Sequence, residues 1–227
     1  MEETQKLAVG EIVHHARHEQ KLSLRELASR ANVSASLLSQ IESGKVTPSI
    51  TSLYHIAEAL SLPIDIFFPK NKKESAQSSP IPTAPSNLED QRQTQHFVHE
   101  ERAEYRPGAD PGRSAGYSPL LHPEARKVLE LMGGITWARL TPCAEDGMEF
   151  LEISYAVGAS SGADMIHHTG REFGLLLEGT LLLELGFERY ELHPGDSTIF
   201  DSTRPHRLTN IGEIPVRALW VRFTRLA

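Results

Sequence analysis

Residues 165–179, MIHHTGREFGLLLEG, contain the side chains of this sequence best suited to metal chemistry. Adjacent histidines at positions 167 and 168 are followed by Glu172 and by an apolar run that ends at Gly179. Imidazole and carboxylate groups together bind divalent iron, zinc, nickel or manganese. The stretch therefore predicts a candidate metal site, provided that the element carrying it turns the right side chains toward one another.

Side-chain alternation along a strand limits which histidine can act together with Glu172. Neighbouring residues of a strand point to opposite faces of the sheet. If His168 points into the fold, His167 points out of it, so only one of the adjacent histidines is a candidate ligand.

The last 110 or so residues contain short runs of β-type residues separated by turns, which is typical of an antiparallel sandwich or barrel. The predicted strands cover 128–132, 135–140, 148–157, 171–179, 180–186, 197–200 and 216–223. Two aromatic residues on them, Tyr155 and Trp220, are candidates for lining a ligand pocket, with an ordinary core position as the alternative.

The first 70 residues instead place apolar side chains at helical spacing. Ser23, with Glu26 three residues later, is typical of a capping box, and Ser34 stands where another N-cap belongs. Gly44 ends the helix that follows Ser34, while Pro63 ends a fourth helix and begins a short fifth. The sequence therefore predicts an all-α N-terminal domain of five helices.

Composition and length limit the class of protein. The chain of 227 residues is long enough for two modest domains, each with its own core. Its formal net charge of −7 argues against non-specific coating of nucleic acid, but a small DNA-reading module needs only a local basic footprint. No apolar run is long enough to span a membrane, and no signal peptide is visible. Cys143 is the single cysteine, so we expect a cytoplasmic protein without an intrachain disulfide or a membrane partner.

The region between the two patterns is rich in Pro, Ser, Lys and Glu over residues 70–93, which predicts a linker. We therefore expect a multidomain α plus β protein. Its parts are an α-helical domain at 1–70, a linker at 71–110 and a β-rich domain at 111–227 with its core at about 128–225.

Residues 22–50, LSLRELASRANVSASLLSQIESGKVTPSI, closely resemble the helix-turn-helix domain of the XRE/Cro repressor-like family. The matching elements are S-L-R-E-L-A, V-S-x-S-L-L-S-Q-I-E-x-G, P-S and I-A-x-A-L, and the resemblance covers residues 6–68. It implies that the helix beginning after Ser34 enters the major groove of double-stranded operator DNA.

With Leu37, Leu38 and Ile41 facing the core, the outer face of that helix carries small polar side chains. Hydroxyl and amide groups donate to and accept from base edges or phosphates, and Lys and Arg pair with phosphates. A solvated surface role is the alternative, especially for the Lys and Arg residues. The candidate DNA-binding residues are Arg25, Ser34, Ala35, Ser36, Ser39, Gln40 and Lys45.

The helical domain carries seven Lys and Arg against eight Asp and Glu, a net charge of −1 over residues 1–70. Phosphate contacts dominate affinity for DNA, so a single copy should bind weakly. We therefore expect a homodimer on two half-sites, held together by the C-terminal domain.

Two segments of the β-rich part resemble the paired motifs of the cupin family. They are GADMIHHTGREFGLLLEG at 162–179 and HPGDSTIFDSTRPHRLTN at 193–210. The resemblance implies a jelly-roll barrel, the double-stranded β-helix. It also implies a four-residue metal site made of two alternating histidines, a glutamate and a histidine of the second motif.

This chain departs from that pattern, because Ile166 replaces the first histidine. The set that remains is His168, Glu172 and His206, two imidazoles and one carboxylate, as in a facial triad for divalent iron, and it also suits zinc, nickel or manganese. Three interpretations stay open: a metal that helps to hold a small effector, a metal-free pocket in which these residues hydrogen-bond, and a catalytic metal centre. His206 alone also fits a turn residue after Pro205.

The domain order resembles bacterial transcriptional regulators in which the cupin domain senses a small molecule. It implies a non-enzymatic, sequence-specific DNA-binding regulator that responds to a small-molecule effector. The alternative is a mononuclear non-haem iron cupin oxygenase or epoxidase with a helical accessory domain. The polar outer face of the 34–43 helix favours the regulator.

Overall fold

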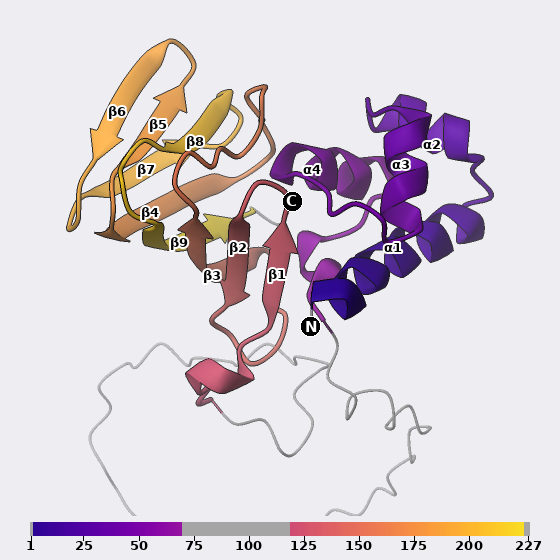
Figure 1. Ribbon diagram of the computed structural model, residues 1–227, viewed down its shortest axis with the longest axis horizontal. Coiled ribbons are helices and arrows are strands. Elements are labelled where there is room, and N and C mark those ends of the chain that lie inside the picture. Colours follow the sequence, from indigo (N-terminus) through magenta and orange to yellow (C-terminus); the bar gives the residue numbers. More distant parts are fainter. Residues whose placement is uncertain (1, 70–118, 225–227) are drawn as a thin grey trace, which may run out of the picture. The chain divides into compact units, whose positions relative to one another are not determined.

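The computed structural model describes residues 2–69 and 119–224 (Figure 1). These two ranges belong to one compact unit. The predicted linker at 71–110 and the first residues of the predicted cupin domain lie outside the described residues.

The N-terminal range consists of four α-helices and a short 3-10 helix. Helix α1 packs against α3, and α2 packs against both α3 and α4. The predicted fifth helix is a single 3-10 turn, because the four residues that follow Pro63 are long enough only for i→i+3 hydrogen bonds. The elements are α1 (Glu2–Glu19), α2 (Leu24–Arg30), α3 (Ala35–Glu42), α4 (Ile50–Ala59) and η1 (Ile64–Phe67).

Serine caps begin the helices where the sequence predicts them. The Ser23 hydroxyl accepts from the Glu26 amide at 3.2 Å, and the Glu26 carboxylate accepts from the Ser23 amide at 2.7 Å. Ser34 accepts from the amide of Leu37 at 3.0 Å. Gly44, with φ +68°, adopts the left-handed conformation just beyond α3. The capping box and the boundaries of α3 are therefore confirmed.

A buried ion pair ties α1 to the C-terminal end of α3. Arg17 is only 8% exposed. Its Nε and Nη2 donate to the two carboxylate oxygens of Glu42 at 2.6 and 2.7 Å, and its Nη1 donates to the Leu22 carbonyl at 3.0 Å. This bidentate contact fixes the helix that carries the candidate DNA-binding side chains.

The C-terminal range forms two antiparallel sheets, one in the strand order β1-β2-β3-β9-β4-β7 and one in the order β6-β5-β8 (Figure 1). A short 3-10 helix, η3 (Pro123–Ala125), precedes them. The strands are β1 (Val128–Leu131), β2 (Ile135–Arg139), β3 (Met148–Tyr155), β4 (Arg171–Glu178), β5 (Leu181–Leu185), β6 (Glu188–Leu192), β7 (Ser197–Asp201), β8 (His206–Asn210) and β9 (Val216–Phe223).

Strands β6 and β8 are absent from the sequence prediction. Four of the five residues of β6 are exposed, and β8 turns two polar side chains, His206 and Asn210, toward the interior. Neither strand therefore shows the apolar alternation on which strand prediction depends. Asn210 connects β8 to the end of β3 and to the segment before β9, because its Nδ2 donates to the carbonyls of Tyr155 and Ile214 at 3.0 and 2.9 Å.

Cross-strand register gives the large sheet an apolar row on its outward face. Phe150 of β3 is opposite Val221 of β9, which is opposite Phe173 of β4, and Phe173 is opposite Ile199 of β7. Phe173 and Ile199 are 40% and 52% exposed. The outward row therefore presents apolar side chains to solvent on four adjacent strands.

The neighbouring residue on three of these strands forms a charged row on the inward face. Arg222 of β9 is opposite Glu149 of β3 on one side and opposite Glu172 of β4 on the other. A guanidinium therefore lies between two carboxylates in the register of the sheet, and all three side chains line the same interior cavity.

Candidate metal centre and pocket

The structure brings together the three ligand candidates selected from the sequence. The ligand atoms of His168, Glu172 and His206 all lie within 4.8 Å of one another. Glu172 Oε1 is 2.8 Å from His168 Nε2 and 3.5 Å from His206 Nε2. Glu172 and His206 are 4% and 3% exposed. These separations suit donors that share one ion at bond lengths of about 2.0–2.2 Å.

The two adjacent histidines differ in exposure as the sequence predicts, although both lie before β4 and outside the named strands. Ile166 is buried and exchanges backbone hydrogen bonds with His206 at 2.9 and 2.8 Å, while His167 is exposed. His168 returns to the inner side and reaches Glu172. The alternative in which His206 is only a turn residue is wrong, because His206 begins β8.

Backbone carbonyls fix the tautomer of both imidazoles. His168 Nδ1 lies 3.2 Å from the Thr169 carbonyl, and His206 Nδ1 lies 2.9 Å from the Arg204 carbonyl. A carbonyl oxygen only accepts, so each Nδ1 carries a proton and each Nε2 is left to face Glu172. His168 Nε2 is buried without a hydrogen-bond partner, despite its short distance to Glu172 Oε1. An unpaired nitrogen of this kind fits a metal ligand.

The charge of Glu172 is balanced within this cluster. Burial by itself would raise the pKa of Glu172, but the facing imidazoles of His168 and His206 outweigh it and hold the pKa well below its usual range. Burial would lower the pKa of His206, and the hydrogen bond to Glu172 raises it instead. Protons on the imidazoles or a divalent cation can therefore supply the same positive charge, and the donor set fits either.

Trp220 orients the carboxylate. Its indole Nε1 donates to Glu172 Oε2 at 2.7 Å, which leaves Oε1 directed at the histidines. Gly174 of β4, the cross-strand partner of Trp220, makes room for the ring, because a Cβ at Gly174 would lie 2.1 Å from it. The sequence leaves Trp220 as either a core or a pocket residue. Its pairing with Gly174 depends on strand register, which strand prediction does not supply.

A small cavity lies beside this cluster. Both predicted pocket residues, Tyr155 and Trp220, line it, together with Trp137 of β2. Its interior volume is about 30 Å³, which is room for one or two water molecules. The walls are mostly apolar, with Glu172 and His206 at one end.

Helix α4 closes this cavity from the N-terminal domain. The ring of Tyr54 stacks on His168, and Ile50, one turn earlier, also lines the wall. The guanidinium of Arg222 lies 5.0 Å from the centre of the Tyr54 ring, and Trp137 meets the same ring edge-on at 6.1 Å. No sequence pattern marks Tyr54 for this role, because its partners lie more than eighty residues away in the chain.

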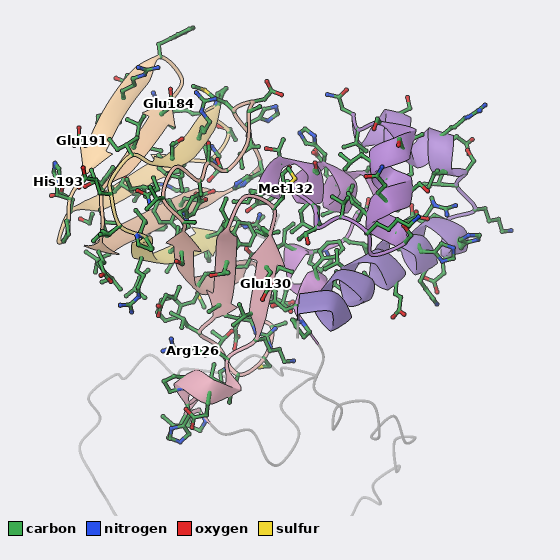
Figure 2. The ribbon with its side chains drawn as sticks, viewed as in Figure 1. Arg126, Glu130, Met132, Glu184, Glu191 and His193 are labelled. Atoms are coloured by element: carbon green, nitrogen blue, oxygen red, sulfur yellow. The ribbon has the colours of Figure 1, made fainter. Side chains whose placement is uncertain are left out.

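Polar contacts hold the flanks of α4 on the barrel. The amide of Met132, at the β1–β2 turn labelled in Figure 2, donates to the Pro48 carbonyl at 3.0 Å. Thr51 Oγ1 donates to the Ser161 carbonyl at 3.3 Å, and Arg139 Nη1 donates to Asp65 at 2.7 Å. The residues that follow α3 are therefore connected directly to the barrel.

The candidate DNA-binding residues lie on and around α3. Ser36, Ser39 and Gln40 are exposed on one face of the helix, with Gln40 Nε2 3.5 Å from Ser36 Oγ. Ala35 departs from the expectation of a fully outward position, since it is half-buried against the core. The remaining candidates, Arg25, Ser34 and Lys45, are exposed, and the Ser34 hydroxyl is engaged as the N-cap.

Charged pairs cover the small sheet, away from the cluster. Figure 2 shows Glu191 and His193 at its outer edge, where their side chains lie 3.6 Å apart and are exposed. Glu184 of β5 lies between Arg207 of β8 and Arg189 of β6, at 2.6 and 3.2 Å. Hydrogen bonding from Arg207 lowers the pKa of Glu184.

Comparison with known proteins supports the assignment of a helix-turn-helix domain and of a cupin domain. Residues 14–67 match the helix-turn-helix family and residues 151–222 match the cupin domain family. The HTH-type transcriptional regulator PuuR of Escherichia coli is 23% identical over 210 residues, which cover 90% of this chain and 88% of PuuR. The transcriptional regulator ClgR of Mycobacterium tuberculosis is 41% identical over 58 residues, 26% of this chain and 52% of ClgR.

A solved structure shares the fold. The crystal structure of an HTH_3 family transcriptional regulator from Vibrio cholerae aligns with a TM-score of 0.61 and 20% identity over 100% of both chains. Within residues 2–69 and 119–224, no helix is long and apolar enough to cross a membrane.

Proposed function

The chain joins an XRE-type helix-turn-helix domain to a C-terminal cupin domain, and we propose that it is a cytoplasmic transcriptional regulator that binds operator DNA and responds to a small molecule in the cupin. A curated relative named as a transcriptional regulator spans both domains. In this proposal α3 reads the major groove with Ser36, Ser39 and Gln40, while Arg25 and Lys45 contact phosphates.

The observation that carries the proposal is the contact between Tyr54 and His168. The DNA-binding domain supplies part of the pocket wall through α4, and α4 packs against α2. A ligand that fills the pocket changes what Tyr54 and Ile50 contact. Linkage between effector and DNA requires that such a ligand bind two arrangements of α4 on the barrel with different affinities.

A divalent transition metal held by His168, Glu172 and His206 is part of this proposal. When bound, it would supply open coordination positions for an oxygen or nitrogen donor of the effector. The same residue set keeps a mononuclear iron oxygenase as the second candidate function. DNA binding separates the two, because an oxygenase has no need of a sequence-specific helix surface.

Dimerisation is proposed to use the outward apolar row of the large sheet. Phe173 and Ile199 belong to a contiguous patch that also includes Leu175 and Val221. Exposed apolar patches of this kind mark protein contacts. A two-fold pairing of this face would present two α3 helices to two half-sites, which a nearly neutral reading domain needs.

DNA binding is tested by fluorescence anisotropy with the full chain and a fragment of its own upstream region. Gln40→Ala should cost about 1–3 kcal/mol on the preferred sequence and less on random DNA. Lys45→Ala should weaken all sequences alike and reduce the salt slope by about one, whereas Lys127→Ala, in the barrel domain, should change neither. A folded protein without sequence preference at moderate salt would overturn the regulator.

The dimer is tested by light scattering after size exclusion. Phe173→Asp together with Ile199→Asp should give a monomer that keeps its circular dichroism spectrum. Phe187→Asp, which changes a fully exposed phenylalanine at the β5–β6 turn, is the matched control and should remain dimeric. A dimer that survives the double substitution would place the interface elsewhere.

A further inference from the structure

Three buried side-chain atoms of the described residues lack a hydrogen-bond partner, and they occur around one aromatic ring. They are Glu149 Oε2, His168 Nε2 and Arg222 Nε. The rings of Tyr54 and His168 are stacked, and Arg222 lies over the Tyr54 ring on a strand next to that of Glu149. An unpaired buried polar group costs about 1–3 kcal/mol, so several at one place indicate a missing partner.

The pair formed by Glu149 and Arg222 leaves one polar atom of each side chain without a hydrogen-bond partner. Arg222 Nη2 of β9 donates to Glu149 Oε1 of β3, and the two residues are cross-strand neighbours. The guanidinium Nε–H and the second carboxylate oxygen remain unpaired, although their register would permit a bidentate pair. One free donor with positive charge therefore lies beside one free acceptor with negative charge.

Both residues border the interior cavity and a larger outer cleft. The cavity and the cleft have Tyr54, Glu149 and Arg222 in common. The outer cleft measures about 460 Å³, against about 30 Å³ for the interior. Tyr54, Glu149 and Arg222 therefore form the boundary between the interior cavity and the outer cleft.

We propose that Glu149 and Arg222 form the recognition subsite for a small ligand that carries a carboxylate beside an ammonium or hydroxyl group, as in 2-amino and 2-hydroxy acids. The ligand carboxylate accepts from Arg222 Nε, and its ammonium or hydroxyl donates to Glu149 Oε2. This inference rests on the proposed function, since it names the chemical class of the effector.

Charge explains why both groups are needed on the ligand. A ligand with only a carboxylate would be attracted by Arg222 but repelled by Glu149 and Glu172. A ligand with only an ammonium group would be repelled by Arg222. A ligand with both signs, or with a hydroxyl donor, pairs each free group without leaving a buried charge uncompensated. Most of the remaining wall is apolar and suits a hydrocarbon side chain, with Ser161, Glu172 and His206 as its further polar residues.

Intrinsic tryptophan fluorescence gives a direct assay, because both tryptophans of the chain, Trp137 and Trp220, line the cavity. The full chain is titrated with a panel of 2-amino and 2-hydroxy acids, from glycine and alanine to lactate and larger side chains. Propionate and isopropylamine serve as analogues of alanine that lack one group. We expect a saturable change with at least one acid of the panel and none with analogues lacking either group.

Substitutions of the subsite have matched controls on the same strands. Glu149→Gln, which keeps the side-chain shape, and Arg222→Gln should each weaken binding about tenfold or more. Glu152→Gln and Arg217→Gln break a comparable pair outside the pocket, 3.0 Å apart, and should leave the affinity unchanged. Circular dichroism shows whether Arg222→Gln folds, and Glu149→Gln decides the question if it does not.

The possible outcomes test the ligand subsite separately from the proposed function as a DNA-binding regulator. Absence of binding across the panel, or equal binding of propionate or isopropylamine, overturns the ligand class. Binding that persists in a folded Glu149→Gln variant overturns the subsite. Anisotropy with operator DNA, measured on the same samples, tests the regulator independently, because DNA binding does not require that this ligand be correct.

Discussion

The phenol ring of Tyr54 lies flat on the imidazole of His168, with ring centroids 4.7 Å apart and planes 10° from parallel. Tyr54 belongs to the DNA-binding domain, and His168 is a candidate metal ligand in the barrel. The helical domain and the candidate metal centre therefore contact each other through this pair of rings.

Tyr54→Ala should loosen the attachment of α4 to the barrel. A double-mutant cycle with His168→Ala should give a coupling energy of about 0.5–1.5 kcal/mol, the usual value for an aromatic pair. Acrylamide should also quench the tryptophans more strongly, because Tyr54 covers Trp137. Tyr54→Phe keeps the ring and should behave as the wild type. Additive effects of the two alanine substitutions would contradict a direct contact.

Metal content should depend on His168 and His206 but not on His167. Protein prepared without a histidine tag is loaded with Fe(II) or Zn(II), desalted and measured by elemental analysis. The His168→Ala/His206→Ala double variant should lose the retained metal, because one carboxylate alone binds such ions weakly. His167→Ala removes an exposed neighbouring imidazole and serves as the control. Metal retained by the double variant would refute the assignment.

Glu42→Gln should destabilise the helical domain strongly. The substitution leaves the buried Arg17 guanidinium without its counter-charge, a change that typically costs about 3–5 kcal/mol. Urea denaturation followed by the helical circular dichroism signal measures it. Glu19→Gln disrupts the exposed contact between His15 and Glu19 and should shift stability by less than about 1 kcal/mol. Equal effects of the two substitutions would show that burial of the Arg17 pair is unimportant.

The small sheet should lose stability in acid through Glu184. Because the hydrogen bond from Arg207 lowers its folded pKa, the stabilisation is present above the unfolded carboxyl pKa and is lost as pH falls through the folded value. Glu184→Gln should therefore lower the melting temperature at pH 7. The wild type and the variant should converge once the pH lies below the lowered folded pKa of Glu184. A difference that stays constant with pH would exclude the ion pair as its cause.

Much of the fold is predictable from local sequence signals. Ser23, Glu26, Ser34 and Gly44 mark the helix boundaries, because caps act within a few residues. The strands with apolar alternation are likewise visible. Strands β6 and β8 are not, since their positions depend on pairing with β5 and their inward residues are polar.

The site is predictable only as far as motifs and alternation reach. His168, Glu172 and His206 follow from the resemblance to the paired cupin motifs, and the outward position of His167 follows from the expected alternation. The contributions of Tyr54, Arg222 and Glu149 depend on contacts between distant segments, which neither composition nor periodicity reveals. These are the residues that close the pocket and leave unpaired polar atoms at its edge.

The two rows of the large sheet are made of adjacent residues: Glu149 with Phe150, Glu172 with Phe173, and Arg222 with Val221. Deleting or inserting one residue within β3, β4 or β9 would invert every side chain beyond it. A charge would then lie on the apolar outer face, and a large apolar side chain would enter the polar end of the pocket. These strands can accept many substitutions, but they cannot change in length without losing both surfaces at once.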